Sequence, residues 1–202
     1  MGLPPDPGST TTATLCDRWR SGRREAFPRL YGRVLPALRM WSSLRVPAGL
    51  RARLDPEDLI QEVWYRAVAG FGDFDPARGS FRSWVFGIAG NVLRMELRSL
   101  GRRQRSGPPR SLDSLSAGEQ AADWTSASRK LARSEEFERV LAAAEALDED
   151  SRRLLLFRGL EGLSHREVGE RLGIGEAAAQ QRWQRLRARL RLELLPPTWF
   201  ED

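Results

Sequence analysis

A stripe of acidic and amide side chains occurs in a chain that is otherwise strongly basic. Helical spacing in the segment LDPEDLIQEVWYRAV, residues 54–68, places Asp58, Gln61 and Glu62 on one side of a helix. The formal net charge of the whole chain is nevertheless +6. Because carboxylates repel phosphate, the stripe is either a solvated helix face or a contact for a basic protein surface. The residue types alone leave both interpretations open.

A second group of side chains has the chemistry of base recognition. In a helix predicted from about residue 176, four polar side chains fall on the face opposite an apolar stripe: Gln180, Gln181, Gln184 and Arg185. Glutamine and arginine each make paired hydrogen bonds to base edges in the major groove. The other arginines of this helix are suited to neutralising phosphates. The alternative is an ordinary helical hairpin with a solvated basic face.

The residues before that helix predict a helix-turn-helix. Ser164 and Glu167 have the spacing of a capping box, which marks a helix start. Gly169 is small where a second helix must cross, and Gly173 stands where a short turn needs a positive φ. The second helix has an apolar stripe at helical spacing, formed by Ala179, Trp183, Leu186 and Leu190. Because these signals agree, they favour DNA binding over a plain hairpin.

Aromatic residues and arginines are concentrated between residues 74 and 105. Phe81, Trp84 and Phe86 follow a glycine-containing loop, and five arginines come after them: Arg94, Arg98, Arg102, Arg103 and Arg105. Unpaired bases stack on aromatic rings while cations hold the nucleic-acid backbone, so the pattern is typical of single-strand binding. The alternative is that these rings form the core of a small helical domain, and some of them must do so.

The composition excludes several classes of function. Cys16 is the sole cysteine and His165 the sole histidine, so we expect no disulfide within the chain, no zinc site of the usual kind, and no cofactor. A hydrolase is disfavoured as well, because it would need paired carboxylates or a histidine base in one pocket, and the sole histidine is expected on an exposed turn of the helix-turn-helix. Lys130 is the only lysine, so the basic excess is arginine, whose planar fork suits phosphate and guanine.

The organisation along the chain predicts an all-α protein of two small helical domains joined by a flexible linker. Residues 1–13 are expected to be disordered, 14–100 and 131–195 to be helical domains, 101–130 to be the linker, and 196–202 to form a tail. We find no signal-peptide pattern and no apolar run of about 20 residues. A soluble, cytoplasmic protein is the expectation.

The motifs resemble those of a bacterial RNA polymerase sigma factor of the extracytoplasmic-function type (group IV of the sigma-70 family). LDPEDLIQEV with FDPARGSFRSWVFGIAGN is similar to the second conserved region of that family, and GLSHREVGERLGIG with the helix after it looks like the fourth. The resemblance covers residues 14 to 195. It implies a promoter-specificity subunit without catalysis. The alternative is a helix-turn-helix regulator that binds duplex DNA without polymerase.

The resemblance also implies a role for each group of side chains. The polymerase contacts would be Asp58, Gln61 and Glu62, which face the clamp of the largest subunit, with a further contact to the polymerase flap. The −10 element would be read as single strand by the loop at residues 74–80 together with Trp84, Asn91, Arg94 and Arg98. The −35 element would be read as duplex by Gln180, Gln181, Gln184 and Arg185. An anti-sigma protein is an expected partner. The sequence departs from the family pattern at Gly90, where a basic residue is common, at Met95, where an acidic one is common, and at Gln180, where lysine or arginine is frequent.

Overall fold

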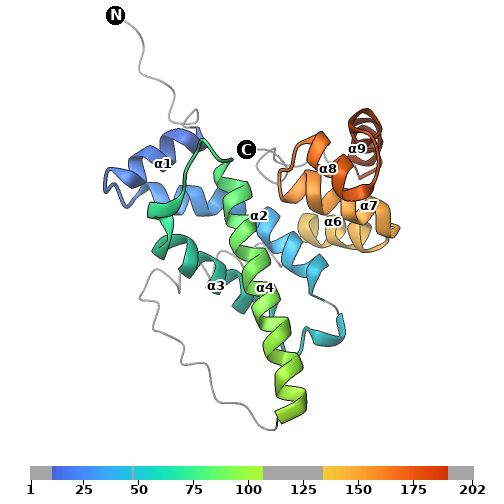
Figure 1. Ribbon diagram of the computed structural model, residues 1–202, viewed down its shortest axis with the longest axis horizontal. Coiled ribbons are helices and arrows are strands. Elements are labelled where there is room, and N and C mark those ends of the chain that lie inside the picture. Colours follow the sequence, from blue (N-terminus) through green and yellow to red (C-terminus); the bar gives the residue numbers. More distant parts are fainter. Residues whose placement is uncertain (1–10, 47, 107–133, 191–202) are drawn as a thin grey trace, which may run out of the picture.

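The computed structural model describes residues 11–46, 48–106 and 134–190, which form helices joined by short turns (Figure 1). No strand occurs in these three ranges, so the prediction of an all-α fold is confirmed. The helices fall into an N-terminal group, from α1 to α4, and a C-terminal group, from α6 to α9. The predicted tail and the predicted linker beyond residue 106 lie outside the described residues.

The N-terminal group consists of four α-helices and two short 3-10 helices. Its elements are α1 (Thr12–Arg20), α2 (Ala26–Arg45), η2 (Ala48–Leu50), α3 (Pro56–Ala69), η3 (Phe71–Asp73) and α4 (Phe81–Ser106). The start of α3 is fixed by Asp55, whose carboxylate accepts a hydrogen bond from the backbone N of Glu57 at 2.8 Å, and by Pro56 at the first helical position. The apolar stripe of α3 is buried as predicted, at Leu59, Ile60, Val63 and Ala67.

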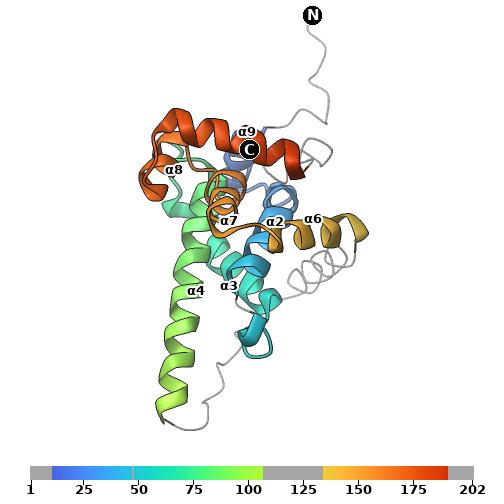
Figure 2. The same ribbon diagram turned by 90° about the vertical axis from the view of Figure 1, so that its right-hand side faces the viewer.

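Helix α4 carries the aromatic segment and is the longest element. Its first half is anchored by a stripe that recurs at intervals of three and four residues and is buried: Phe81, Val85, Ala89 and Val92. Its second half projects beyond the other helices (Figure 2). The helix continues to Ser106, past residue 100, where the composition predicts the linker to begin. Arginine and glutamine favour helix, which explains why GRRQRS continues it despite its glycine.

The C-terminal group consists of four α-helices and one turn of π-helix. Its elements are α6 (Glu135–Glu145), α7 (Glu149–Leu154), the π-helix η4 (Leu155–Leu160), α8 (His165–Leu172) and α9 (Glu176–Leu190). Three of the helices begin at a side chain that accepts a backbone N–H three residues ahead, namely Ser134, Asp148 and Ser164. The capping box of Ser164 and Glu167 is confirmed, and Gly173 has a φ of 67° as its turn requires.

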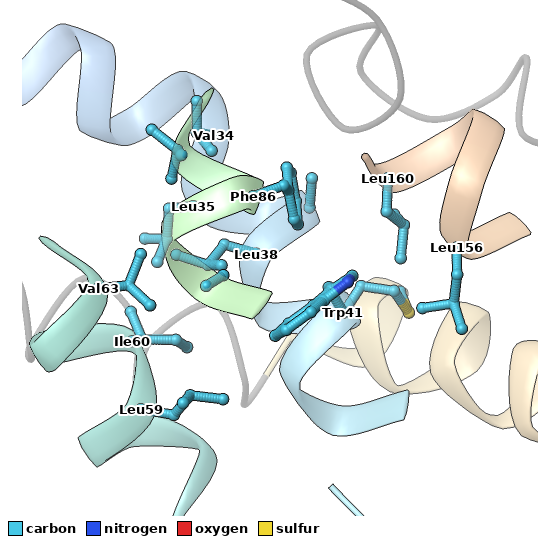
Figure 3. Close-up of a cluster of buried hydrophobic side chains, with 14 of the residues drawn as sticks. Val34, Leu35, Leu38, Trp41, Leu59, Ile60, Val63, Phe86, Leu156 and Leu160 are labelled. Carbon is cyan, nitrogen blue, oxygen red and sulfur yellow. The ribbon is translucent and has the colours of Figure 1, made fainter. Parts of the chain in front are cut away.

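The two groups of helices pack directly against each other. Trp41 of α2 lies between Phe86 of α4 and two leucines of η4, Leu156 and Leu160 (Figure 3). The indole N–H of Trp41 also donates a hydrogen bond to Oε1 of Glu161, at 2.8 Å. The buried apolar side chains of both groups therefore form one continuous core. The sequence predicts two domains on a flexible tether and gives no sign of this contact.

Gly169 allows α8 and α9 to approach closely, and an alanine there is expected to destabilise the turn between them. A Cβ atom at position 169 would lie 2.7 Å from the backbone oxygen of Ile174, so the backbone itself would have to move. We expect Gly169→Ala to lower the free energy of unfolding by about 1–3 kcal/mol. Gly32→Ala is the matched control, since Gly32 is exposed in α2 with no atom near its Cβ position. The control is expected to raise stability by about 0.5–1 kcal/mol, and urea unfolding measures both. Equal stability of Gly169→Ala and the parent would contradict the tight crossing.

Candidate protein and nucleic-acid interfaces

The acidic stripe lies on the solvent side of α3. Asp58 and Gln61 are exposed, while the Glu62 side chain is 41% exposed. Glu62 accepts a hydrogen bond from Nε of Arg66 on the same helix, at 2.6 Å. An exposed ion pair one turn apart is worth only about 0.3–0.5 kcal/mol. Glu62 can therefore exchange Arg66 for a cation of a partner at little cost.

Not every acidic residue of this segment belongs to the stripe. Glu57 is 6% exposed and forms an ion pair with Arg39 of α2, so it faces the interior. Burial makes the charged form of Arg39 less favourable and lowers the pKa of its guanidinium. The adjacent acidic residues, Glu57 and Asp58, thus have opposite orientations. The sequence pattern did not reveal this pairing, because it joins residues 18 positions apart in different helices.

Two large apolar side chains lie beside the acidic stripe. Tyr65 of α3 is 45% exposed and Met95 of α4 is 47% exposed. Arg66 donates a hydrogen bond to the sulfur of Met95 at 3.3 Å, which joins the two helices at this surface. An acidic stripe with apolar side chains at its edge has the composition of a protein contact. In the sequence, Met95 stood out only as a departure from the family pattern.

The aromatic residues around the loop between α3 and α4 are mainly core residues. Phe71, Phe74 and Phe81 are each 6% exposed or less, and their ring centroids lie 5.7–6.1 Å apart. Trp84 completes this cluster, with its ring centroid 5.4 Å from that of Phe74, but is only partly buried. Phe86 and Trp64 are buried as well. The core interpretation thus accounts for most of the rings, and Trp84 is the one at residues 71–86 that retains accessible surface.

Four side chains with the chemistry of strand binding lie along one side of α4. Trp84, Asn91 and Arg98 follow one another at intervals of seven residues, which is close to two helical turns. Arg94 falls between the last two. Asn91, Arg94 and Arg98 are exposed. Arg94 donates a hydrogen bond to the Asn91 amide oxygen, and Nε of Arg98 donates to the backbone oxygen of Arg94 at 3.2 Å. One side of α4 therefore presents an aromatic ring, an amide and two cations.

Helix α9 presents the predicted base-reading side chains to solvent. Ala179, Trp183 and Leu186 are buried against the rest of the C-terminal group, and Leu190 is partly buried. The four polar residues of the opposite face are all exposed: Gln180, Gln181, Gln184 and Arg185. A helix that buries one face in a helix-turn-helix and exposes glutamine and arginine on the other can enter a major groove.

The first helical residue of α8, His165, makes stability depend on pH. Burial, followed by the charge of Arg158, lowers the pKa of His165. Below about pH 6.5 the unfolded chain takes up this proton while the folded chain does not, so the free energy of unfolding falls. We expect that loss to continue as the pH drops through the folded-state pKa, and His165→Gln to remove it. Urea unfolding between pH 5 and 8 measures the difference, and parallel curves for the two proteins would contradict it.

Two observations concern sites of other kinds. The described residues contain no group of three or more histidine, cysteine, aspartate or glutamate side chains placed to hold a metal ion. Among the helices of those residues, none is both long and apolar enough to span a bilayer.

Two protein families match the chain in the order of its two helical groups. Sigma-70 region 2 matches residues 30–103, and Sigma-70, region 4 matches residues 137–190. The RNA polymerase sigma factor CnrH of Cupriavidus metallidurans is 31% identical over 172 residues, which is 84% of this chain and 87% of that protein. The ECF RNA polymerase sigma-E factor of Escherichia coli K12 is 31% identical over 166 residues, 78% of this chain and 81% of that one.

A solved structure, that of CnrH in complex with the cytosolic domain of CnrY, is also similar. It has a TM-score of 0.44 and 26% sequence identity, and the match covers 91% of this chain and 96% of that chain. The two family matches fall on the N-terminal and C-terminal groups of helices, and the two relatives each cover more than three quarters of the chain. The chain belongs to the extracytoplasmic-function group of the sigma-70 family of RNA polymerase sigma factors.

Proposed function

We propose that this sigma factor binds core RNA polymerase through α3 and reads the promoter through α4 and α9, with no catalysis of its own. The observation that carries the proposal is the presence of surfaces of opposite chemistry in one chain. An acidic stripe with an apolar edge lies on α3, while α4 and α9 present arginine and amide side chains. A regulator that only binds duplex DNA has no use for the first of these surfaces.

The acidic stripe is the proposed contact for the polymerase clamp. Asp58, Gln61 and Glu62 would meet basic side chains of the largest subunit, and Tyr65 and Met95 would supply apolar area beside them. The C-terminal group would hold the polymerase flap. Glu62 would exchange its bond with Arg66 for a bond with the clamp, so docking leaves no carboxylate unpaired.

The proposed −10 surface is the side of α4 that carries Trp84, Asn91, Arg94 and Arg98, together with the exposed loop at residues 75–80. Trp84 offers a ring on which an unpaired base can stack, and the arginines follow at the spacing of a strand backbone. The Cβ position of Gly90 has no atom within 4 Å, so the basic residue common in the family would fit there. Its absence leaves one cation fewer for holding the opened strand.

The proposed −35 surface is the outer face of α9. Gln180, Gln181, Gln184 and Arg185 would contact base edges in the major groove, and neighbouring arginines would contact phosphates. Residues 14–100 and 131–195 would be the two functional domains, with residues 101–130 between them. The sigma factor would act in the cytoplasm, where an anti-sigma protein would cover its polymerase-binding faces.

Copurification with core polymerase tests the proposal. Three samples are separated by size: the sigma factor alone, core polymerase alone, and a mixture of the two in equal amounts. We expect the sigma factor to migrate with core polymerase, and the complex to retain a double-stranded promoter fragment that neither component retains alone at the same salt concentration. A sigma factor that migrates as a dimer, binds duplex DNA and ignores core polymerase would instead be a helix-turn-helix regulator.

A further inference from the structure

The last residue of α1 is bonded to the segment that leads from η3 into α4. Nη2 of Arg20 donates a hydrogen bond to the backbone oxygen of Phe74 at 2.7 Å, across 54 positions of the sequence. Figure 1 shows α1 beside this segment. Helix α1 precedes residues 30–103, which match Sigma-70 region 2, and the proposed function gives it no role. The bond therefore joins a helix without an assigned task to the proposed −10 surface.

The guanidinium of Arg20 is held by other groups as well. Its Cζ atom lies 5.8 Å from the ring centroid of Phe71 and 5.3 Å from that of Phe74. A cation over an aromatic face is attracted by the negative side of the ring quadrupole. Nη1 donates to Oδ1 of Asp17, one turn back in α1, at 3.3 Å. Although the Arg20 side chain is 37% exposed, these partners fix the direction in which Nη2 points.

The residue before Arg20 anchors the end of α1 in the core. The ring centroid of Trp19 lies 5.0 Å from that of Phe27 in α2 and 5.9 Å from that of Phe71 in η3. Trp19 is partly buried against the hydrophobic core. The backbone that carries Arg20 is therefore tied to the core of the N-terminal group and does not depend on the loop for its position.

Phe74 is the point at which the chain enters the exposed loop at residues 75–80. It ends η3 with extended backbone (ψ 116°), and its N–H bonds to the oxygen of Phe71 at 3.1 Å. Its ring centroid lies 5.4 Å from that of Trp84, on which we propose that an unpaired base stacks. A shift of Phe74 would therefore move the start of the loop and the support of Trp84 together.

The remaining bonds of the loop are local. The carboxylate of Asp75 accepts the backbone N–H of Ala77 at 2.9 Å, and its backbone oxygen accepts that of Arg78 at 3.1 Å. At the far end, Oγ of Ser80 accepts the backbone N–H of Ser83 at 3.1 Å, where α4 begins. These bonds shape the loop, whereas the bond from Arg20 ties its entrance to another helix.

We propose that Arg20 is a positioning residue for the −10 surface, an inference that rests on the proposed function. Arg20 holds the entrance of the loop so that the loop and Trp84 receive an unpaired base of the promoter, and it does not itself contact DNA. A loop that is in place before DNA arrives does not have to be ordered on binding, which improves affinity. Without the bond, a smaller fraction of the protein has the loop in place, and the apparent affinity falls with that fraction.

Three variants separate positioning from charge. Arg20→Met removes the donors and the charge while keeping an apolar stem against the rings of Phe71 and Phe74. Arg20→Lys keeps a cation and a donor but lacks the planar fork of the guanidinium. Arg23→Met is the matched control, because Arg23 is exposed between α1 and α2 and its loss changes the net charge equally.

Amide hydrogen exchange of the free protein reports on the loop without DNA. The amides of Phe74 and Arg78 are bonded within η3 and the loop, and that of Leu186 in α9 is the reference. We expect Arg20→Met to exchange about 2- to 12-fold faster at Phe74 and Arg78, the factor for losing one hydrogen bond. Exchange at Leu186 should not change. Arg20→Lys should fall between Arg20→Met and the parent, and Arg23→Met should match the parent. Unchanged exchange at both loop amides in Arg20→Met would overturn the proposal.

The same proteins, each bound to core polymerase, are then titrated with a promoter fragment whose −10 segment is kept unpaired by mismatches. The fragment is taken from a start site that requires the sigma factor in transcription in vitro. We expect Arg20→Met to bind it about 2- to 12-fold more weakly and to discriminate less against a scrambled −10 segment. The slope of log K against log salt should stay as in the parent, and Arg23→Met should bind as the parent does.

Three results of this titration would contradict the positioning role. A salt slope that falls by about 0.7 in Arg20→Met alone would mean that Arg20 contacts a phosphate itself. Equal weakening by Arg23→Met would assign the effect to charge. Faster loop exchange with unchanged binding would mean that the position of the loop does not limit −10 recognition. If the parent itself fails to bind the fragment together with core polymerase, the proposed function fails, and the role of Arg20 at the promoter fails with it.

Discussion

The double variant Asp58→Lys/Glu62→Lys is expected to lose binding to core RNA polymerase. Both side chains face solvent on one side of α3, where a basic clamp surface would meet them. Lysines there replace two attractions by two repulsions, each of which costs several kcal/mol at a desolvated contact. The dissociation constant for core polymerase should therefore rise at least about 100-fold. Fluorescence titration of labelled sigma factor with core polymerase measures it.

Two comparisons separate docking from general effects of charge and stability. Asp17→Lys/Glu25→Lys makes the same change in net charge on exposed residues outside α3, and should bind core polymerase as the parent does. The α3 variant loses the Glu62–Arg66 pair and an acidic residue in the first turn, which together cost about 1 kcal/mol of stability. Urea unfolding of this variant should therefore still start from a folded protein and show a cooperative transition. Binding to core polymerase that survives the double change would remove α3 from the docking surface.

The double variant Gln181→Ala/Gln184→Ala is expected to discriminate less between base sequences. The salt dependence of its affinity for DNA should stay the same. Both side chains are exposed on the outer face of α9, and neither carries charge. Each paired hydrogen bond to a base edge is worth about 1–3 kcal/mol of discrimination. Affinity for the −35 duplex should fall, and affinities for single-base variants of that duplex should converge. The slope of log K against log salt should stay constant, because no phosphate contact is removed.

Arg182→Ala provides the contrasting result, because Arg182 is an exposed arginine of α9 outside the base-reading set. It should weaken binding and reduce the salt slope by about 1 for each phosphate contact that is lost. Arg139→Ala removes an exposed arginine of α6, away from α9, and should change neither quantity. Competition titrations over a series of salt concentrations distinguish these outcomes. Equal discrimination by the glutamine variant and the parent would exclude these two residues from base reading.

The features predicted from sequence are those set by neighbouring residues. The capping box of Ser164 and Glu167 and the left-handed turn at Gly173 involve residues a few positions apart, so their types and spacing were sufficient. The apolar stripe of α3 was also recovered, because a buried helix face repeats every three to four residues. The same periodicity places Asp58, Gln61 and Glu62 on the opposite side.

The features that the sequence did not predict join residues far apart in the chain. Arg82 bonds to residues 77 and 78 positions away, and Trp41 bonds to Glu161 across 120 positions. No local pattern distinguishes an arginine that caps a distant helix from one that neutralises phosphate. Residue type likewise could not decide which aromatic rings near the loop are buried. That depends on how η3 turns Phe71 and Phe74 under the start of α4.

Transcription in vitro measures most directly whether this sigma factor selects promoters. Core polymerase is incubated with fragments of genomic DNA, with and without the sigma factor, and the 5′ ends of the transcripts are sequenced. We expect new start sites that share two sequence blocks at a constant spacing, and that vanish with Asp58→Lys/Glu62→Lys. The same start sites with and without the sigma factor would contradict its assignment as a promoter-specificity subunit.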